Sequence, residues 1–256
     1  MEVLLCGRGF IGSRIEELLD ENVYTLDLGD ADYQVDVTEE FDIEKDFDAV
    51  IHTVGLAPGM YTPEDYREVH VEGTRNIVEG VNADRIVYIS ALGVGEVDHS
   101  FFRSKREAER LVEESDMEHT IIRPSVVAGE GNHLLEMMEK LSITRLFPKI
   151  KARVQPITAG DLAAVVESSL HGFGGEILEV GGPEKIQISD YARRVYERKG
   201  RKCFLVPFPR LRLPGKNFLP GFLNPENVAL LDMDNTTDEN DAERILEPET
   251  PEMLQW

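Results

Sequence analysis

The pattern of glycines near the start of the chain constrains the fold more than any other feature. An apolar run at residues 3–6 precedes Gly7-Arg8-Gly9-Phe10-Ile11-Gly12, and an amphipathic helical pattern then continues to about residue 20. In such a strand–turn–helix unit, the first glycine permits the tight turn and the second lets the backbone approach a pyrophosphate. The third allows the helix to pack closely on the strand. The pattern therefore predicts that Gly7, Arg8, Gly9, Phe10, Ile11 and Gly12 bind a dinucleotide.

An acidic residue ends the second predicted strand, at about residues 23–27. Asp27 lies 20 residues after Gly7, where a carboxylate accepts hydrogen bonds from the adenosine ribose hydroxyls. That charge repels a 2′-phosphate and favours NAD(H). Arg8 has the opposite effect, because a guanidinium neutralises such a phosphate. We expect NAD, with NADP as the alternative.

Apolar runs alternate with amphipathic helical patterns as far as residue 206. This alternation predicts an α/β fold, a doubly wound parallel sheet of the Rossmann type with a small C-terminal α/β subdomain. Strands are expected at 2–6, 23–27, 33–35, 49–53, 85–90, 119–123, 176–180 and 202–206, and helices at 10–20, 63–81, 101–114, 133–141, 159–170 and 189–199. Residues 1–206 form the NAD(P)-binding domain, with the subdomain mainly at 130–160 and 176–206. Residues 207–256 are a Pro-rich, acidic extension.

The net charge of −22 over 256 residues disfavours binding to nucleic acid or to an anionic lipid surface by charge. Such acidity also suits a halophilic chain, because salt screens the self-repulsion. No apolar run approaches the length needed to span a bilayer, so membrane insertion is not expected. Two distant cysteines, Cys6 and Cys203, support neither a disulfide framework nor a cysteine metal site, and we expect a cytoplasmic protein with no metal.

Several strings, in order along residues 1–206, resemble the extended and atypical short-chain dehydrogenase/reductases, the group that contains NAD-dependent epimerases and dehydratases. They are DAVIH at 48–52, VEGTRNI at 71–77, RIVYISALG at 85–93, FRSK at 102–105, IIRPSVV at 121–127, QPI at 155–157, DLA at 161–163 and EVGGP at 179–183. The resemblance implies a dinucleotide on the sheet, with Asp36 and Val37 near the adenine. It also implies that the backbone at Thr53, Val54 and Gly55 passes beneath the cofactor. The backbone at Pro124, Ser125 and Val126 would face the nicotinamide.

The sequence departs from the family at its catalytic positions. Active members place a Tyr four residues before a Lys, so that the cation lowers the phenol pKa for proton transfer. Here Lys105 is present, but Phe101 occupies the Tyr position. Lys105 can still bind the nicotinamide ribose. The helper hydroxyl aligns with Ser90 or with the neighbouring Ala91, which the alignment does not separate, and His70 replaces the usual Asn.

Other side chains are candidates to replace the phenol. Tyr61 and Tyr66 lie near the predicted cleft, and His52, His70 and His99 titrate near neutrality in their unperturbed state. A histidine that ends a buried strand, as His52 does, is more often a hydrogen-bonded core residue. Each of the five is a hypothesis, because geometry decides before pKa does.

Two functions remain open. One is an oxidoreductase or epimerase/dehydratase-type enzyme acting on an unidentified small molecule with Lys105 orienting the ribose. The other is a non-enzymatic dinucleotide-binding protein that serves a protein partner. The phrases SALG and FRSK resemble the atypical branch, which includes the Rossmann-fold accessory subunit of respiratory NADH:ubiquinone oxidoreductase. The apolar stretch at 204–223 is either a lid over the cleft or a docking surface. In this family, the helices at 63–81 and 101–114 commonly form a homodimer face.

Overall fold

The computed structural model describes residues 1–129, 131–207 and 229–246. Seven parallel strands form the central sheet in the order β11-β6-β5-β4-β1-β2-β3. Their bounds are β1 Glu2–Cys6, β2 Asn22–Asp27, β3 Tyr33–Gln34, β4 Ile43–His52, β5 Val81–Ile89, β6 Glu118–Pro124 and β11 Glu176–Val180. The predicted Rossmann fold is confirmed.

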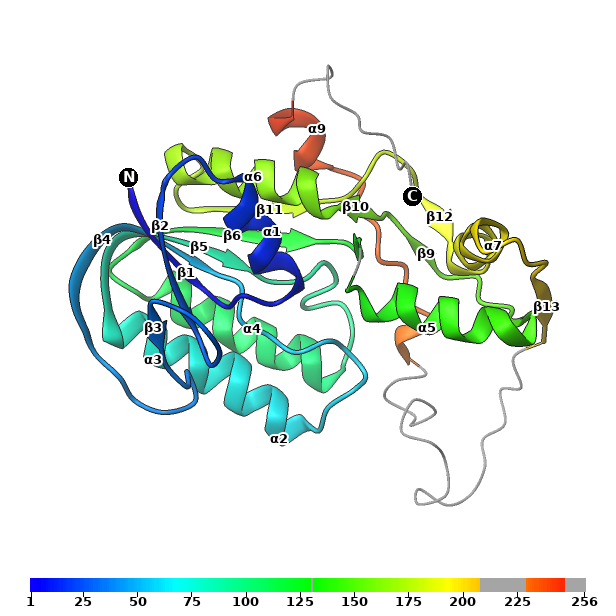
Figure 1. The fold of residues 1–256 in the computed structure, drawn as a ribbon, viewed down its shortest axis with the longest axis horizontal. Helices are drawn as coiled ribbons and strands as arrows, with labels where there is room; N and C mark the ends of the chain where they lie inside the picture. Colours follow the sequence, from blue (N-terminus) through cyan, green and yellow to red (C-terminus); the bar gives the residue numbers. More distant parts are fainter. Residues whose placement is uncertain (130, 208–228, 247–256) are drawn as a thin grey trace.

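Helices cover both faces of this sheet (Figure 1), as the near-continuous apolar character of its strands requires. Helices α1 (Phe10–Leu18) and α6 (Ala159–His171) contact each other on one face. Helices α3 (Gly73–Gly80) and α4 (Ser100–Glu113) contact each other on the opposite face. Two buried apolar clusters, one on each side, hold these layers on the sheet.

The helix predicted at 63–81 consists of three joined segments. It begins as α2 (Pro63–Tyr66), capped by Thr62, whose hydroxyl accepts from the Asp65 N–H. It continues as the π-helical segment η1 (Arg67–Glu72) and ends as α3. A π segment inside an α-helix is uncommon and occurs often at functional sites. Here it contains His70.

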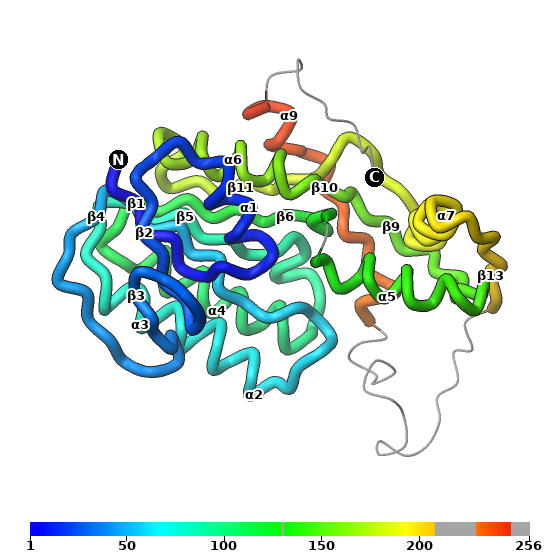
Figure 2. Tube along the Cα trace, viewed as in Figure 1, coloured from blue at the N-terminus to red at the C-terminus, as the bar shows by residue number. Residues whose placement is uncertain are grey.

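A smaller subdomain lies at one end of the sheet and has its own apolar core (Figure 2). It contains helices α5 (His133–Leu141) and α7 (Ile188–Arg198), and the short 3-10 helix η2 (Ser142–Thr144) follows α5. Strand β8 (Leu146–Pro148) pairs with β13 (Phe204–Val206), and β9 (Arg153–Val154) pairs with β12 (Ile186–Gln187). A third pair joins β7 (Val127–Ala128) to β10 (Ile157–Thr158).

Two details differ from the domain division expected from the sequence. Strand β11 lies in the central sheet beside β6, so the range 176–206 does not belong entirely to the subdomain. The described part of the C-terminal extension also returns to the main domain. Helix α9 (Asp241–Ile245) contacts α6 and β11, and Asn235 forms a bridge with Val154 of β9. In the described ranges, no helix is both long enough and apolar enough to cross a membrane.

Candidate dinucleotide site

The glycine loop joins β1 to α1 with little room for side chains. Gly7 has a φ of 95°, in the left-handed region that favours glycine. A Cβ on Gly12 would lie 1.8 Å from the carbonyl oxygen of Gly7, so the close approach of helix to strand requires glycine. A Cβ on Gly9 would meet no protein atom within 4 Å. Gly9 therefore presents its backbone to open space at the N-terminus of α1, which is the geometry that a pyrophosphate needs.

Asp27, at the end of β2, lies beside the same loop. Its Oδ2 accepts a hydrogen bond of 2.6 Å from the Arg8 backbone N–H, and its Oδ1 accepts one of 3.0 Å from Gly29. The Arg8 side chain turns away to Glu16, with an Nε–Oε2 distance of 2.8 Å. The loop thus combines an acid at the predicted ribose position with a guanidinium that already has a carboxylate partner.

The end of β4 supports the loop from the opposite side. The Thr53 hydroxyl lies 3.0 Å from the Cys6 carbonyl oxygen and 2.8 Å from that of Gly7. The Cγ2 of Val54 would lie 3.0 Å from a Cβ placed on Gly7. Asp36 accepts hydrogen bonds from the backbone N–H and the hydroxyl of Thr38. Together, the glycines, Asp27 and the residues after β4 fit an NAD(P) molecule.

Lys105 is buried beneath the exposed Gly55. Its Nζ donates to the Ile89 carbonyl oxygen at 2.9 Å and lies 4.8 Å from the centre of the Tyr88 ring. The same Nζ would be 3.1 Å from a Cβ on Gly55. Burial lowers the pKa of Lys105 to about 7, against the opposing effect of the Glu109 carboxylate. The amine therefore lies next to the Gly55 backbone that is predicted to pass beneath the cofactor. It changes charge near neutral pH.

Phe101 belongs to an aromatic cluster one helical turn before Lys105. Its ring makes edge contacts with the rings of Tyr66, His70 and Phe102, at centroid distances of 5.6, 5.5 and 5.1 Å. The ring is buried and carries no ionisable proton. At the position where the family resemblance implies a phenol, this protein has an apolar packing contact.

His70 uses both ring nitrogens in the interior. The Leu56 backbone N–H donates to Nε2 at 2.9 Å, so Nδ1 carries the ring proton and donates to the Ser104 hydroxyl at 2.8 Å. Burial and the Lys105 charge lower the pKa of His70 to about 2. The neutral His70 imidazole thus holds the loop after β4 in position through the Leu56 backbone N–H.

The other histidines and tyrosines named from the sequence also make structural contacts. His52 Nε2 lies 2.8 Å from the Thr74 hydroxyl, and burial lowers its pKa to about 3. His99 caps α4 by accepting from the Phe101 backbone N–H. The Tyr66 hydroxyl donates to the Ala57 carbonyl oxygen at 2.9 Å. Tyr61 is exposed, and its ring contacts that of Tyr66.

Ser90 points into a buried charge network. Its hydroxyl donates to Oε1 of Glu109 at 2.7 Å, and Arg123 donates to both oxygens of the same carboxylate, at 2.8 and 2.7 Å. The Glu109 side chain is fully buried. Burial raises the pKa of Glu109, but hydrogen bonds from Arg123 and Ser90 outweigh it and hold the pKa below its ordinary value. The sequence shows charges at three- and four-residue spacing on this helix, as on an exposed face, and gives no sign that the Glu109 carboxylate is buried.

The segment at residues 229–246 reaches the opposite end of the predicted cleft. The sequence did not indicate this contact. The side-chain amide of Asn235 donates to the Leu92 carbonyl oxygen at 2.8 Å, and the Ser125 hydroxyl donates to the oxygens of Asn235. The Met233 Cε would be only 2.3 Å from a Cβ on Gly93. These residues cover the backbone after β5 and β6, where the nicotinamide side was predicted. No sequence signal distinguishes them within an acidic tail.

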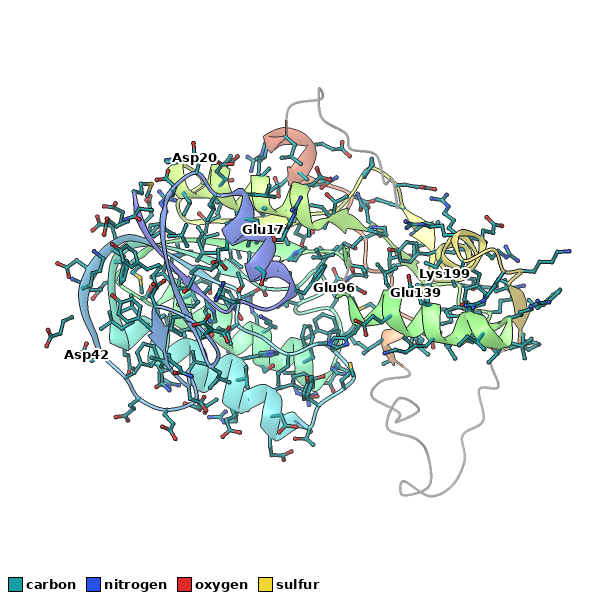
Figure 3. All side chains as sticks on the ribbon, in the orientation of Figure 1. Glu17, Asp20, Asp42, Glu96, Glu139 and Lys199 are labelled. Carbon is teal, nitrogen blue, oxygen red and sulfur yellow. The ribbon has the colours of Figure 1, made fainter. Side chains whose placement is uncertain are left out.

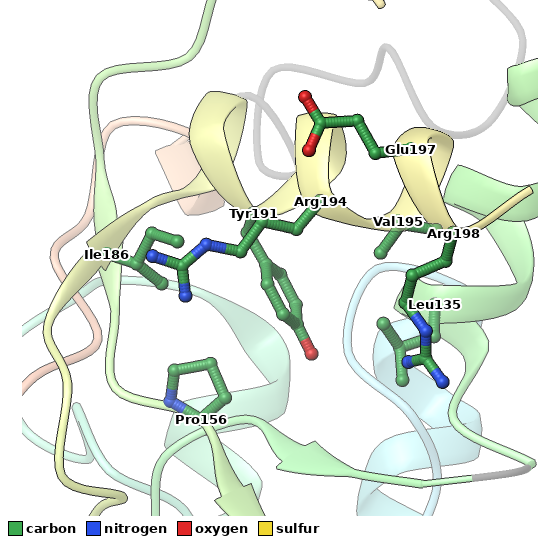
Figure 4. Close-up of a pocket in the computed structure, with 8 residues that line it drawn as sticks. All are labelled: Leu135, Pro156, Ile186, Tyr191, Arg194, Val195, Glu197 and Arg198. Carbon is green, nitrogen blue, oxygen red and sulfur yellow. The ribbon is translucent and has the colours of Figure 1, made fainter. Parts of the chain in front are cut away.

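A separate hollow of about 360 Å³ lies in the smaller subdomain. Figure 4 shows Tyr191, Arg194 and Arg198 of α7 around it, together with Leu135 of α5 and Pro156. The Arg194 guanidinium lies within 2.6 and 2.7 Å of the two Glu184 carboxylate oxygens. None of the predicted dinucleotide-site residues lines this hollow.

Comparison with known proteins identifies related chains. The family described as NAD(P)H-binding matches residues 12–171, a range that starts at the last glycine of the loop. The chain is 24% identical over 144 residues to the 40 kDa subunit of NADH-ubiquinone oxidoreductase from Neurospora crassa, covering 52% of this chain and 38% of that protein. It is 23% identical over 201 residues to the NADH dehydrogenase 1 alpha subcomplex subunit 9 of Dictyostelium discoideum, covering 74% and 54%. The matches thus span about half or less of these relatives.

Among solved structures, dTDP-4-dehydrorhamnose reductase from Bacillus anthracis in complex with NADP is similar in fold. The TM-score is 0.67 at 18% identity, over 82% of this chain and 84% of that one. The family match and the fold agree with the cofactor class predicted from the glycine loop.

Proposed function

The chain belongs to the NAD(P)H-binding family, and on that premise we propose that it binds NAD(H) without catalysing proton-coupled turnover of a small substrate. The observation that carries the proposal is Phe101, buried among aromatic rings one helical turn before Lys105. A phenol at this position supplies the proton in active relatives, and a phenylalanine has none to give.

The cofactor would be held at three places. The amides that open α1, with Gly9 facing open space, would bind the pyrophosphate. The Asp27 carboxylate would accept from the adenosine ribose hydroxyls, and its negative charge favours NAD over NADP. In its protonated form, Lys105 donates one hydrogen bond to the Ile89 carbonyl oxygen and has two more N–H bonds for the second ribose. When bound, the nicotinamide supplies hydride chemistry.

The other candidates for proton transfer support the same proposal through their contacts. His70 is neutral, with both nitrogens in hydrogen bonds, and the Ser90 hydroxyl is directed to Glu109. Ser125, predicted at the nicotinamide side, donates to Asn235. A bound dinucleotide would then stabilise this chain or report the redox state to a protein partner. The names of the relatives, which are subunits of NADH dehydrogenases, support a role within an assembly.

The test combines binding with turnover. We expect calorimetry to detect NADH binding to the unmodified protein, while NADH oxidation with a panel of carbonyl and quinone substrates stays at the buffer rate. Phe101→Tyr, which restores the phenol, should retain NADH binding, and Phe101→Leu is the matched packing control. Turnover by the unmodified protein would overturn the non-enzymatic proposal, and failure to bind either nucleotide would overturn the dinucleotide proposal.

One observation favours a second candidate, a reductase in which Lys105 itself delivers the proton. Its pKa near 7 gives a buried amine that exchanges a proton at neutral pH. This candidate predicts turnover that Lys105→Met abolishes and that falls as the pH rises through 7. If no such pH-dependent rate is found, the reductase candidate is refuted and only the binding function stands.

A further inference from the structure

The lysines and arginines of this acidic chain are distributed very unevenly. Residues 140–153 and 198–225 contain 12 of its 27 Lys+Arg residues and none of its 49 Asp+Glu residues. The rest of the sequence is therefore more acidic than the net charge of −22 indicates. An argument from total charge overlooks this separation.

The described parts of these two segments lie together in the smaller subdomain. Strand β8 pairs in parallel with β13, and Leu146 lies opposite Phe204 in the register. The next pair, Phe147 and Leu205, packs into the subdomain core. Since successive side chains alternate between faces, Leu146 and Phe204 point outward. Figure 1 shows β13 at the end of the molecule farthest from β4.

This outer face exposes apolar side chains of substantial size. Ile143 is 73% exposed and Phe204 is 55% exposed, and Leu146 and Val206 are also exposed. We call the surface formed by residues 143–151 and 198–206 the basic pole. Adjacent exposed apolar side chains are unfavourable in water, and on a surface they mark an interaction site.

Most cations of the basic pole also differ from the others in their pairing. Most exposed lysines and arginines of the described chain lie within 4 Å of a carboxylate, as Arg153 does with Asp234. Within the pole, Lys199 has such a partner in Glu139, and both are labelled in Figure 3. Among residues 1–129, 131–207 and 229–246, those without such an ion pair include a group in the basic pole. This group consists of Arg145, Lys149, Lys151, Arg198 and Lys202. Arg110 of α4 is an exposed cation outside the pole that also lacks one.

We propose that the basic pole binds peripherally to an anionic lipid surface. Lipid phosphates attract the unpaired cations, while the interfacial region accepts Ile143, Leu146 and Phe204. A nucleic acid would use the cations and leave the aliphatic side chains in water. Repulsion from the acidic main domain is screened within about 8 Å at physiological salt, so charges at the contact decide binding.

Co-sedimentation with vesicles tests the proposal. We expect the full-length protein to sediment with phosphatidylcholine vesicles that contain phosphatidylglycerol and to stay in solution with phosphatidylcholine alone. Raising NaCl from about 0.1 M to about 1 M, which shortens the screening length to about 3 Å, should release it. Lys202→Gln should weaken partitioning about fivefold, because each cation at an anionic surface contributes about that factor. Phe204→Ser should weaken it without changing the dependence on salt.

Two matched variants serve as controls. Arg110→Gln removes an exposed, unpaired cation from α4, and Leu18→Ser removes an exposed apolar side chain from the end of α1. Both should partition like the unmodified protein. The proposal is overturned if Arg110→Gln and Lys202→Gln have equal effects or if no vesicle binds. Binding to soluble polyglutamate but not to vesicles would assign the pole to an acidic protein. Concentration-dependent self-association lost in Phe204→Ser would assign it to a second copy, and either outcome overturns the lipid proposal.

Discussion

The Ser125 hydroxyl oxygen lies 2.7 Å from the backbone carbonyl oxygen of Asn235 and 2.7 Å from its side-chain Oδ1, across 110 residues of sequence. Through this contact, the segment at residues 229–246 packs against the backbone that follows the carboxyl end of β6. The Asn235 amide also reaches the Leu92 carbonyl oxygen after β5. One side chain therefore joins two neighbouring strand ends to the C-terminal segment.

Asn235→Ala tests the strength of this junction. The substitution leaves the Leu92 carbonyl oxygen and the Ser125 hydroxyl with fewer partners. We expect the free energy of unfolding to fall by about 1–3 kcal/mol. Urea denaturation measures the change. Asn82→Ala, which removes an amide bonded to Asp46 at an exposed position, is the control and should have a much smaller effect.

Substitutions of Gly9 and Gly12 distinguish an effect on cofactor binding from an effect on folding. A Cβ on Gly9 meets no protein atom, so Gly9→Ala should cost about 1 kcal/mol of stability or less as a helix N-cap change. It should weaken NADH binding at least about tenfold, or about 1.4 kcal/mol, by blocking the pyrophosphate. Gly12→Ala should instead impair folding, since its Cβ would overlap the Gly7 carbonyl. Calorimetry and thermal denaturation distinguish the two, and unchanged NADH affinity in folded Gly9→Ala would refute the predicted phosphate position.

Asp27→Ser addresses the choice between NAD and NADP. Removal of the carboxylate removes its repulsion of a 2′-phosphate as well as its hydrogen bonds to the ribose. The ratio of NADPH to NADH affinity should rise about tenfold, which fluorescence titration measures. Glu16→Gln removes the negative charge that lies 2.8 Å from Nε of Arg8, so this carboxylate no longer neutralises the guanidinium, and the variant should have a higher NADPH affinity without weaker NADH binding. An unchanged ratio in Asp27→Ser would contradict the assigned role.

Lys105 makes stability depend on pH. Its pKa is about 7 in the folded protein and about 10.4 in an unfolded chain, so the unfolded state binds the extra proton between these values. Folding stability therefore rises with pH over that interval, because the penalty for the buried charge disappears. Lys105→Met should flatten the rise. Unfolding free energies of both proteins from pH 6 to 10, at about one-unit steps, give the difference curve.

Glu109→Gln examines the buried charge network. The substitution leaves the Arg123 guanidinium without its bidentate carboxylate, and losing one partner of a buried pair costs about 3–5 kcal/mol. Glu107→Gln on the same helix changes an exposed residue and should remain within about 0.5 kcal/mol of the unmodified protein. Equal destabilisation of the two variants would show that the network contributes nothing specific.

The sequence predicts individual strands and helices well where the pattern is local. Strands β1 and β11 and helix α5 have the predicted bounds. These segments have short-range signals in apolar runs and helical spacing, which depend on neighbouring residues alone. The glycine loop was also found from local rules, because the motif assigns a steric reason to Gly7 and Gly12 and an open approach to Gly9.

Long-range contacts explain what the sequence did not provide. Whether β11 joins the central sheet depends on its pairing with β6, and sequence periodicity does not specify a partner. Ser90 and Glu109 likewise carried no signal of their 2.7 Å bond, because a serine after a strand suits a cleft or a core equally. In the sequence, Asn235 is one polar residue in an acidic tail. Only its contacts with Leu92 and Ser125 in the folded chain distinguish it.

The position of Asn235 in the chain has a consequence for biosynthesis. A ribosome completes all seven strands of the sheet before it delivers residues 229–246, so a nascent Rossmann domain must wait with its strand ends uncovered. During that interval the Leu92 carbonyl oxygen and the Ser125 hydroxyl lack the Asn235 groups that they contact in the complete chain. Because synthesis proceeds from the N-terminus, this junction is the last part of the domain to form.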